Sequence, residues 1–191
     1  MSRHCLVGGT NILLINGIEK KIEELKVDDE LVVYEIKNMK NTQNIEILKI
    51  QKEDTIRGEF KKSLIKNIWL DHTDNYYIIN DKLNITGEHI ILLQRGDVYF
   101  WGEVNQILEG DFMFTNSGIF ERVIKIERLE SMENVYNVQL NEIYNYFANG
   151  YLVHNGDPCT ACSGCGAEES EEEEEGSGSG SGSGSGKGGG S

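Results

Sequence analysis

Short apolar runs separated by turn residues recur along the first 155 positions of the chain. These runs are rich in Val, Ile, Leu, Phe and Tyr, the residues that fit the pleated, half-buried surface of a strand. Turn pairs such as Asn16-Gly17 and Asn149-Gly150 separate them, so the spacing predicts an all-β fold. The expected strands lie at 12–15, 31–36, 76–79, 90–93, 98–101, 112–115 and 135–140.

Two segments depart from the strand pattern. Ile22-Glu23-Glu24-Leu25 places apolar residues three apart, which predicts a single helical turn. The stretch 38–62 is polar and weakly patterned, and it predicts a long loop or an irregular hairpin.

An internal repeat links two parts of the chain. Ten residues from Ile22 align without gaps to ten residues from Val104. Apolar Ile22, Leu25 and Leu31 meet Val104, Ile107 and Met113, and Asp29 meets Asp111. So short a match fits a duplicated, pseudo-symmetric β unit, and it also fits chance similarity between two amphipathic turns.

Composition divides the chain near residue 155. Residues 156–191 hold 12 of the 22 glycines and eight of the 32 acidic residues, and no Leu, Ile, Val or aromatic residue. Such a segment cannot bury enough apolar surface to offset its ordering entropy. We therefore expect a core domain over 5–155, a short flank over 1–4, and a disordered, acidic Gly/Ser-rich tail over 156–191.

The balance of charged residues narrows the classes of partner that the chain is expected to bind. Residues 1–155 carry 17 basic and 24 acidic residues, and the whole chain has a formal charge of −14. Phosphate binding favours a basic face, so nucleic acid is not expected. No run approaches 18 apolar residues, so a membrane span is not expected either, and residues 1–4 are too short for a signal peptide. We expect a cytoplasmic monomer.

The four cysteines fall into two groups. Cys159, Cys162 and Cys165 have the spacing of metal ligands but lack a fourth partner, so reduced thiols and no metal or cofactor are expected. Cys5 stands alone in the core, where a lone thiol is a small hydrophobe or a nucleophile.

Chemistry-bearing residues occur in an ordered set of short motifs. Cys5-Leu6-Val7-Gly8-Gly9-Thr10 opens the core, and Thr86-Gly87-Glu88-His89 lies in its middle. Val135-Tyr136-Asn137-Val138 and then 145–155, which ends in His154-Asn155, close it. In this order the set resembles the splicing blocks of the intein family, over 5–155. The resemblance implies a pseudo-two-fold, horseshoe-shaped Hint fold. It also implies a single-turnover, self-cleaving or self-splicing domain whose substrate is its own flanking sequence, which leaves open whether it counts as an enzyme.

The resemblance assigns roles at the first junction. Cys5 would attack the carbonyl of His4 and convert the amide into a thioester. His89 would protonate the departing amide nitrogen, and Thr86 would form a hydrogen bond at the scissile carbonyl.

It assigns a second scission to the other end. The side-chain nitrogen of Asn155 would attack its own backbone carbonyl, form a five-membered succinimide and release Gly156. His154 would polarise that carbonyl or protonate the leaving amine.

Several positions depart from the family pattern. Gly156 stands where splicing requires Cys, Ser or Thr, and Asn137 and Tyr144 replace an expected Asp and His. These accessory positions weaken the coupling of the two ends, as in bacterial intein-like domains, so cleavage is expected over splicing. Cys159 is a weaker candidate for a displaced acceptor. About 45 residues separate the central motif from the closing ones, too few for a homing endonuclease.

Two other interpretations remain open at this stage. The core could be an inactive β-rich binding module with a metal- or redox-active cysteine tail. It could also be a Hedgehog-type domain that passes the thioester to an external nucleophile, although His154-Asn155 argues against this because such domains do not need that terminus.

Overall fold

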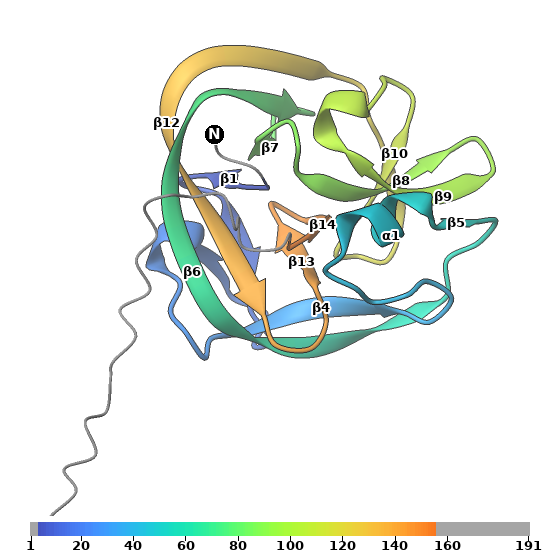
Figure 1. Ribbon diagram of the computed structural model, residues 1–191, viewed down its shortest axis with the longest axis horizontal. Coiled ribbons are helices and arrows are strands. Elements are labelled where there is room, and N and C mark those ends of the chain that lie inside the picture. The colour runs from blue at the N-terminus through green and yellow to red at the C-terminus, as the bar shows by residue number, and fades with distance from the viewer. Residues whose placement is uncertain (1–3, 156–191) are drawn as a thin grey trace, which may run out of the picture. The chain divides into compact units, whose positions relative to one another are not determined.

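The computed structural model describes residues 4–155, and these residues are nearly all β, as predicted (Figure 1). The expected tail and its cysteines lie outside the described residues. Two short 3₁₀ turns, η1 (Ile22–Glu24) and η2 (Val104–Gln106), and one helix, α1 (Ile45–Ile50), accompany the strands in this part of the chain. The strands are β1 (Leu6–Val7), β2 (Asn11–Leu13), β3 (Glu19–Lys21), β4 (Glu30–Ile36), β5 (Lys52–Glu53), β6 (Gly58–Ile79), β7 (Leu83–Ile85), β8 (Ile90–Arg95), β9 (Val98–Glu103), β10 (Phe112–Phe114), β11 (Phe120–Arg122), β12 (Ile126–Leu140), β13 (Asn145–Ala148) and β14 (Tyr151–His154).

The strands between residues 4 and 155 form two sheets. The five-stranded sheet has the order β12-β1-β7-β6-β4, with a further pairing of β12 to β6. The nine-stranded sheet has the order β11-β10-β8-β14-β13-β2-β3, with β9 paired to both β8 and β5. All the pairings are antiparallel. The short strand β1 is therefore central, between β7 and β12.

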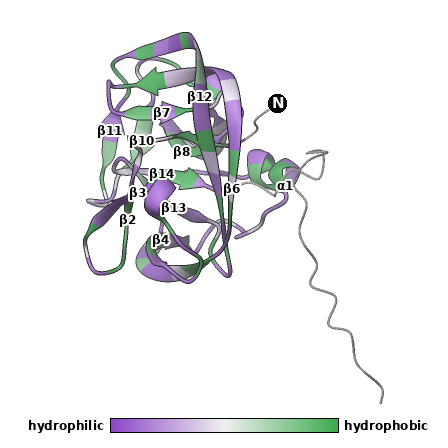
Figure 2. Cartoon of the chain, turned by 90° about the vertical axis from the view of Figure 1, so that its left-hand side faces the viewer, coloured by the Kyte–Doolittle hydropathy of each residue, from purple (hydrophilic) through white to green (hydrophobic). Residues whose placement is uncertain are grey.

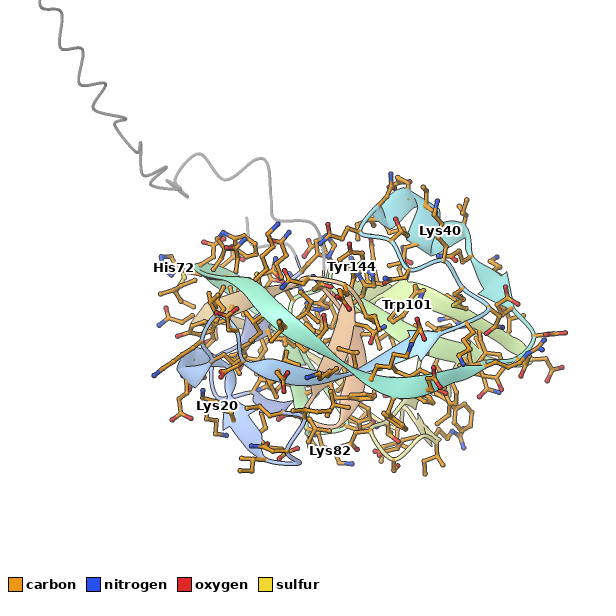
Figure 3. The ribbon with its side chains drawn as sticks, turned by 90° about the horizontal axis from the view of Figure 1, so that it is seen from below. Lys20, Lys40, His72, Lys82, Trp101 and Tyr144 are labelled. Carbon is orange, nitrogen blue, oxygen red and sulfur yellow. The ribbon has the colours of Figure 1, made fainter. Side chains whose placement is uncertain are left out.

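Two long strands frame the molecule. β6 and β12 run beside each other as curved arcs in Figure 1, and their register runs from Ile126 opposite Ile79 to Leu140 opposite Ile65, with two irregularities. β6 pairs with β4 along its first third, from Gly58 opposite Ile36 to Leu64 opposite Glu30. The sequence predicted only 76–79 and 135–140 of these two strands. His72 is exposed on β6, opposite Asn134 of β12, and lies far from Lys40 beside α1 (Figure 3).

The prediction of a loop or irregular hairpin over 38–62 was wrong in part. Helix α1 forms there because the Asn44 side chain caps it, accepting a hydrogen bond from the Ile47 N–H at 3.1 Å. Leu48 is its one buried residue. From Gly58 onward the chain is a strand most of whose exposed side chains are polar, with Lys61 bonded to Glu35 at 2.6 Å. Its stability comes from backbone pairing with β4 and from such cross-strand charges, which leave little apolar signal.

The core lies between the two sheets and explains the unbroken apolar runs. Residues 90–93 of β8 are all buried, as are all four residues of β13 and of β14. Strands covered on both faces read as continuous apolar segments rather than alternating ones. In Figure 2 these strands are largely green, whereas β6 and β12 carry purple, hydrophilic stretches.

The internal repeat corresponds to a repeated structure. In both copies a 3₁₀ turn is followed by an Asp whose carboxylate accepts a backbone N–H three residues earlier: Lys26 to Asp29, and Leu108 to Asp111, each at 2.9 Å. The residue before each Asp has a positive φ, +70° at Asp28 and +98° at Gly110. The two copies therefore share their backbone conformation as well as their residue pattern, which favours the duplicated unit over chance similarity.

Within residues 4–155, no helix has the length and apolar character needed to cross a membrane.

Candidate active site

The position of β1 brings Cys5 between two other strands. Leu6 pairs with Ile85 of β7 on one side and with Tyr136 of β12 on the other. Continuing this antiparallel register by one residue places Cys5 opposite Thr86 and opposite Asn137. Cys5 is 5% exposed, so its thiol reacts, if at all, in a site from which bulk water is largely excluded.

Thr86 is bonded to both backbone polar groups of Cys5. Its Oγ1 accepts a hydrogen bond from the Cys5 N–H at 2.9 Å and donates one to the Cys5 carbonyl at 3.1 Å. The Thr86 N–H also donates to the Cys5 carbonyl, at 3.0 Å. The expected partner was the carbonyl of His4; the hydroxyl instead holds the amide nitrogen of the same scissile bond. Thr86 therefore contacts the nitrogen of the His4–Cys5 peptide bond.

His89 follows three residues later and is fully buried. Neither ring nitrogen has a hydrogen-bond partner among the described residues. Burial lowers the pKa of His89 to about 3, and the nearby imidazoles of His4 and His154 lower it further, whereas backbone groups of Cys5 and His154 act in the opposite direction. His89 is therefore neutral at pH 7 and has both junctions within electrostatic range.

His4, the residue before the scissile bond, is packed into the site. Its ring meets that of His89 edge to face, with the ring centroids 6.3 Å apart. Its φ is +66°, a left-handed conformation that costs a non-glycine residue about 1–2 kcal/mol. Burial lowers the pKa of His4, against the opposing charges of Glu103 and Glu88. The His4–Cys5 peptide bond thus follows a residue with a strained backbone that is partly buried.

The last strand carries the second junction to the same place. Val153 of β14 pairs with Ile91 of β8, and the antiparallel register then places Asn155 beside His89. His154 is buried, and its ring lies edge to face on Trp101 at 5.3 Å between centroids. Burial lowers the pKa of His154 to about 3, with the backbone of Thr42 acting in the opposite direction. His154 is therefore also neutral at pH 7.

Asn155 is held by the turn that precedes β13. Its backbone N–H donates to the carbonyl of Tyr144 at 2.9 Å. In the side-chain orientation that satisfies both amide atoms, Nδ2 donates to the same Tyr144 carbonyl at 2.7 Å and Oδ1 accepts from the Leu140 N–H at 3.1 Å. Tyr144, chosen from the sequence for its side chain, acts here through its backbone.

Two further buried polar groups lie in this region. Asn137 is 6% exposed, and its Oδ1 has no hydrogen-bond partner among residues 4–155. The Tyr146 hydroxyl, fully buried on β13, is unpaired within the same residues. Burial raises the pKa of Tyr146, and the proximity of Cys5 raises it further. Unpaired polar atoms at this depth are uncommon and cluster at functional sites.

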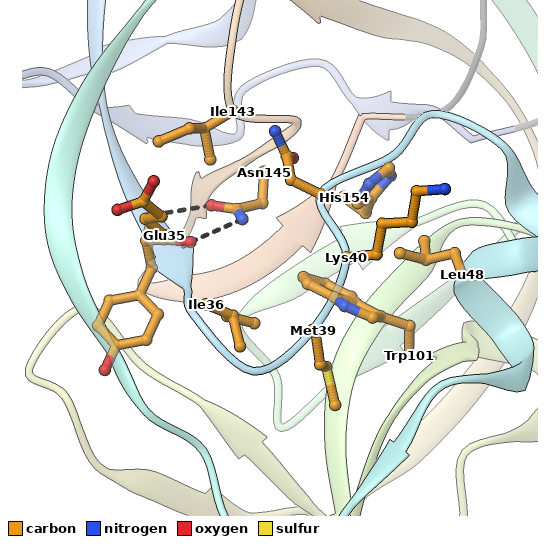
Figure 4. Close-up of a pocket in the computed structure, with 11 residues that line it drawn as sticks. Glu35, Ile36, Met39, Lys40, Leu48, Trp101, Ile143, Asn145 and His154 are labelled. Carbon is orange, nitrogen blue, oxygen red and sulfur yellow. Dashed lines mark hydrogen bonds between the residues drawn. The ribbon is translucent and has the colours of Figure 1, made fainter.

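A small cavity lies against His154. It has a volume of about 20 Å³, the size of one water molecule. Figure 4 shows the His154 ring beside Trp101, with Lys40 and Asn145 among the other residues that line the cavity. The Asn145 side chain anchors β13 by accepting from the Tyr34 N–H at 2.8 Å and donating to the Tyr34 carbonyl at 2.9 Å.

The structure thus brings together all the core residues singled out from the sequence: Cys5, Thr86, His89, Asn137, Tyr144, His154 and Asn155, with His4. Gly156 lies outside the described residues. The sequence did not point to Trp101 or to Asn145. Nor did it point to the contacts that the Asn41 side chain and the Thr42 backbone make near the second junction. Asn145 stood inside a closing motif and could have been found there; the others lie far from any motif.

Solved structures share the architecture of this chain, although its sequence matches no known family. No family model and no curated protein sequence matches the chain. The bacterial intein-like domain from Clostridium thermocellum is 19% identical, with a TM-score of 0.62 over 81% of this chain and 100% of that one. A DnaB intein from Synechocystis is 16% identical, with a TM-score of 0.57 over 80% and 98% of the two chains. The gp41-1 intein is 18% identical, with a TM-score of 0.56 over 81% and 100%.

These similarities define the fold. Residues 5–155 have the Hint fold, the pseudo-two-fold β architecture predicted above. More particularly, the fold is that of inteins and bacterial intein-like domains.

Proposed function

We propose that this chain is an autoprocessing, intein-like domain that cuts its own backbone on either side of residues 5–155. The observation that carries the proposal is the convergence of the two junctions on His89. Cys5 is tied to Thr86, three residues before His89. The β8–β14 register, continued two residues past the Val153–Ile91 pair, brings Asn155 next to His89. Two reactive ends separated by 150 positions meet at one enclosed imidazole.

The first scission begins at Cys5. Its Sγ, having lost its proton, bonds to the carbonyl carbon of His4, and the carbon–nitrogen bond to Cys5 breaks. The nitrogen takes up a proton and becomes a free amine. Thr86 Oγ1 already contacts this nitrogen at 2.9 Å, so it can keep the amide aligned, while the neutral His89 accepts the proton from Sγ and passes it to the nitrogen. Water then hydrolyses the thioester, which leaves a carboxylate on His4 and regenerates the thiol.

The second scission is a cyclisation. Nδ2 of Asn155 bonds to the Asn155 carbonyl carbon, and the bond to the nitrogen of Gly156 breaks. One proton leaves Nδ2 and one arrives on the Gly156 nitrogen, so the products are a succinimide and a free amine. Tyr144 and Leu140 hold the amide of Asn155, which lowers the entropic cost of closing the ring. The neutral ring of His154 is adjacent in sequence and can accept or return the proton.

Cleavage without ligation is the expected outcome. Gly156 has no side chain to take the acyl group from Cys5, so each scission ends in water or in the succinimide. The substrate is the domain's own flanks, 1–4 and 156–191, and we propose that it acts as a monomer without a cofactor.

Trapping the thioester tests the first half of this proposal. In an Asn155→Ala chain, only the His4–Cys5 bond can break. Hydroxylamine should convert residues 1–4 into a hydroxamate and release a chain that begins at Cys5. The same treatment of an Asn155→Ala chain that also carries Cys5→Ser should release far less, because an oxygen ester forms less readily. Release that is independent of Cys5 would exclude the thioester.

A further inference from the structure

The segment between β4 and β6 contacts the second junction through one side chain, that of Asn41. We infer that Asn41 is a positioning residue for the cyclisation of Asn155, acting by fixing the turn whose Tyr144 carbonyl binds Asn155. The inference rests on the proposed function, and it concerns a residue outside every motif found in the sequence.

Asn41 forms two hydrogen bonds to the backbone of one turn. Its Nδ2 donates to the carbonyl of Glu142 at 2.6 Å, and its Oδ1 accepts from the N–H of Tyr144 at 3.2 Å. More than 100 positions separate Asn41 from both partners. A side-chain amide paired in this way imitates a neighbouring strand, and it fixes the peptide groups on either side of Ile143.

The same turn binds Asn155 from its other side. The Tyr144 carbonyl accepts both the backbone N–H of Asn155, at 2.9 Å, and its Nδ2, at 2.7 Å. The direction of that carbonyl sets where the attacking nitrogen lies. Since Asn41 holds the N–H of the same residue, a rotation of the turn after loss of Asn41 would move the nucleophile.

Two contacts hold the other flank of the turn. The Asn141 N–H donates to the Leu64 carbonyl at 3.1 Å, and the Glu142 N–H donates to Ser63 Oγ at 3.3 Å. Both hold the start of the turn against β6, ahead of Tyr144. Among the described residues, Asn41 is the side chain bonded to the Tyr144 N–H.

The segment that carries Asn41 also adjoins His154. Thr42, the next residue, has its backbone close enough to raise the pKa of His154. Lys40 and Asn41 line the cavity beside the His154 ring (Figure 4). One short stretch therefore lies beside His154 and also fixes the turn that binds Asn155.

The size of the effect follows from the strength of such bonds. Asn41 is exposed, and the net value of a hydrogen bond at the surface corresponds to roughly a 2- to 10-fold change in an equilibrium or a rate. Misplacing a nucleophile costs more when the reaction demands a fixed geometry. We expect Asn41→Ala to slow cyclisation about 10-fold and to leave the first scission within twofold of its normal rate.

The two scissions are measured separately, each in a chain in which a substitution blocks the other scission. Full-length chains are made by cell-free translation, and cleavage is followed over time by mass spectrometry. A Cys5→Ala background reports cyclisation alone, and an Asn155→Ala background with added thiol reports the first scission alone. Asn41→Ala should slow release of 156–191 in the first background only. Asn41→Asp keeps an acceptor for the Tyr144 N–H. Its cyclisation rate should lie between that of the chain with Asn41 and that of the Asn41→Ala chain.

Asn38→Ala is the matched control. Asn38 lies in the same segment and also bonds the backbone on both sides, donating to the Thr55 carbonyl at 2.8 Å and accepting from the Arg57 N–H at 3.0 Å. It does not reach the 141–144 turn, so its loss should leave cyclisation unchanged. The inference is overturned if Asn41→Ala cyclises at the normal rate, if Asn38→Ala slows cyclisation equally, or if Asn41→Ala slows both scissions together. Failure of the proposed function looks different, because the Cys5→Ala chain with Asn41 intact would then release nothing.

Discussion

The hydroxyl of Thr86 brackets the backbone of Cys5, accepting from its N–H at 2.9 Å and donating to its carbonyl at 3.1 Å. Both contacts lie on the side of the scissile bond that leaves. A peptide group whose N–H is bonded to an oxygen is held in one orientation. In the proposed first scission, Thr86 would therefore align the leaving nitrogen before the thiol attacks.

Replacing Thr86 by Val tests this alignment. Val keeps the β-branched shape but removes both hydroxyl contacts and leaves the buried Cys5 N–H unpaired, which costs about 1–3 kcal/mol. The first scission should slow about 10- to 100-fold, and cyclisation at Asn155 should keep its rate. Thr86→Ser retains the hydroxyl and is the control, with a rate close to normal. Equal rates for the Val and Ser chains, measured by thiol-induced release of residues 1–4, would contradict the assignment.

The two buried imidazoles predict acid sensitivity. Folding lowers the pKa of His89 and of His154 from an ordinary 6.5 to about 3. Between those values the unfolded chain binds protons that the native chain does not, so stability is complete above about pH 6.5 and is lost as the pH falls towards 3. Each histidine should remove about 1.4 kcal/mol of unfolding free energy for each pH unit in that window.

Urea unfolding at pH 6 and pH 5 measures this slope. The uncleaved chain with both Cys5→Ala and Asn155→Ala serves as the reference. Adding His154→Gln should reduce the loss of stability between the two pH values by about 1.4 kcal/mol, because one proton uptake is removed. An unchanged slope would mean that His154 is already charged in the native state.

The two Asp residues of the internal repeat, Asp29 and Asp111, are predicted to contribute unequally to the stability of the fold. The side chain of Asp111 is 3% exposed and is bonded twice by Arg95, at 2.7 and 2.8 Å. That of Asp29 is 21% exposed and meets Lys20 at 2.8 Å. Asp111→Ala should therefore destabilise the fold by about 2–4 kcal/mol, and Asp29→Ala by about 1 kcal/mol. Thermal or urea unfolding of the two variants compares them directly, and equal losses would show that burial does not decide their value.

The absence of a nucleophilic side chain at Gly156 is the proposed reason that cleavage is favoured over splicing. If the missing acceptor is the main obstacle, Gly156→Cys should divert acyl groups from water to a new thiol and yield residues 1–4 joined to residue 156. Transfer requires the new sulfur within about 3.5 Å of the thioester carbon. Mass spectrometry distinguishes the ligated peptide from the separate fragments. Fragments alone would indicate that Asn137 and Tyr144, and not Gly156, uncouple the two ends.

The sequence predicted most of the fold because its buried strands are continuous apolar runs between turn residues, as at 90–93. It missed most of β6 because that strand is exposed over much of its length and is stabilised by backbone pairing and cross-strand charges. It missed α1 because the helix is only six residues long and buries one side chain, Leu48.

The candidate residues were found from ordered motifs, whereas their surroundings were not. Trp101, Asn41 and Glu103 reach the junctions only through tertiary structure, and no local pattern marks them. Tyr144 was singled out for its side chain, but its carbonyl makes the contact to Asn155. Backbone groups carry no signature in the identity of the residue, so this role could be read only from the structure.

The central claim is that the chain cuts itself at two separate bonds, and intact-mass measurement of freshly translated full-length protein tests it most directly. Under reducing conditions the unmodified chain should give fragments that end at His4 and at Asn155. Cys5→Ala should abolish only the first cut, and Asn155→Ala only the second. An unmodified chain that keeps its full mass, with residues 1–4 and 156–191 still attached, would contradict the account.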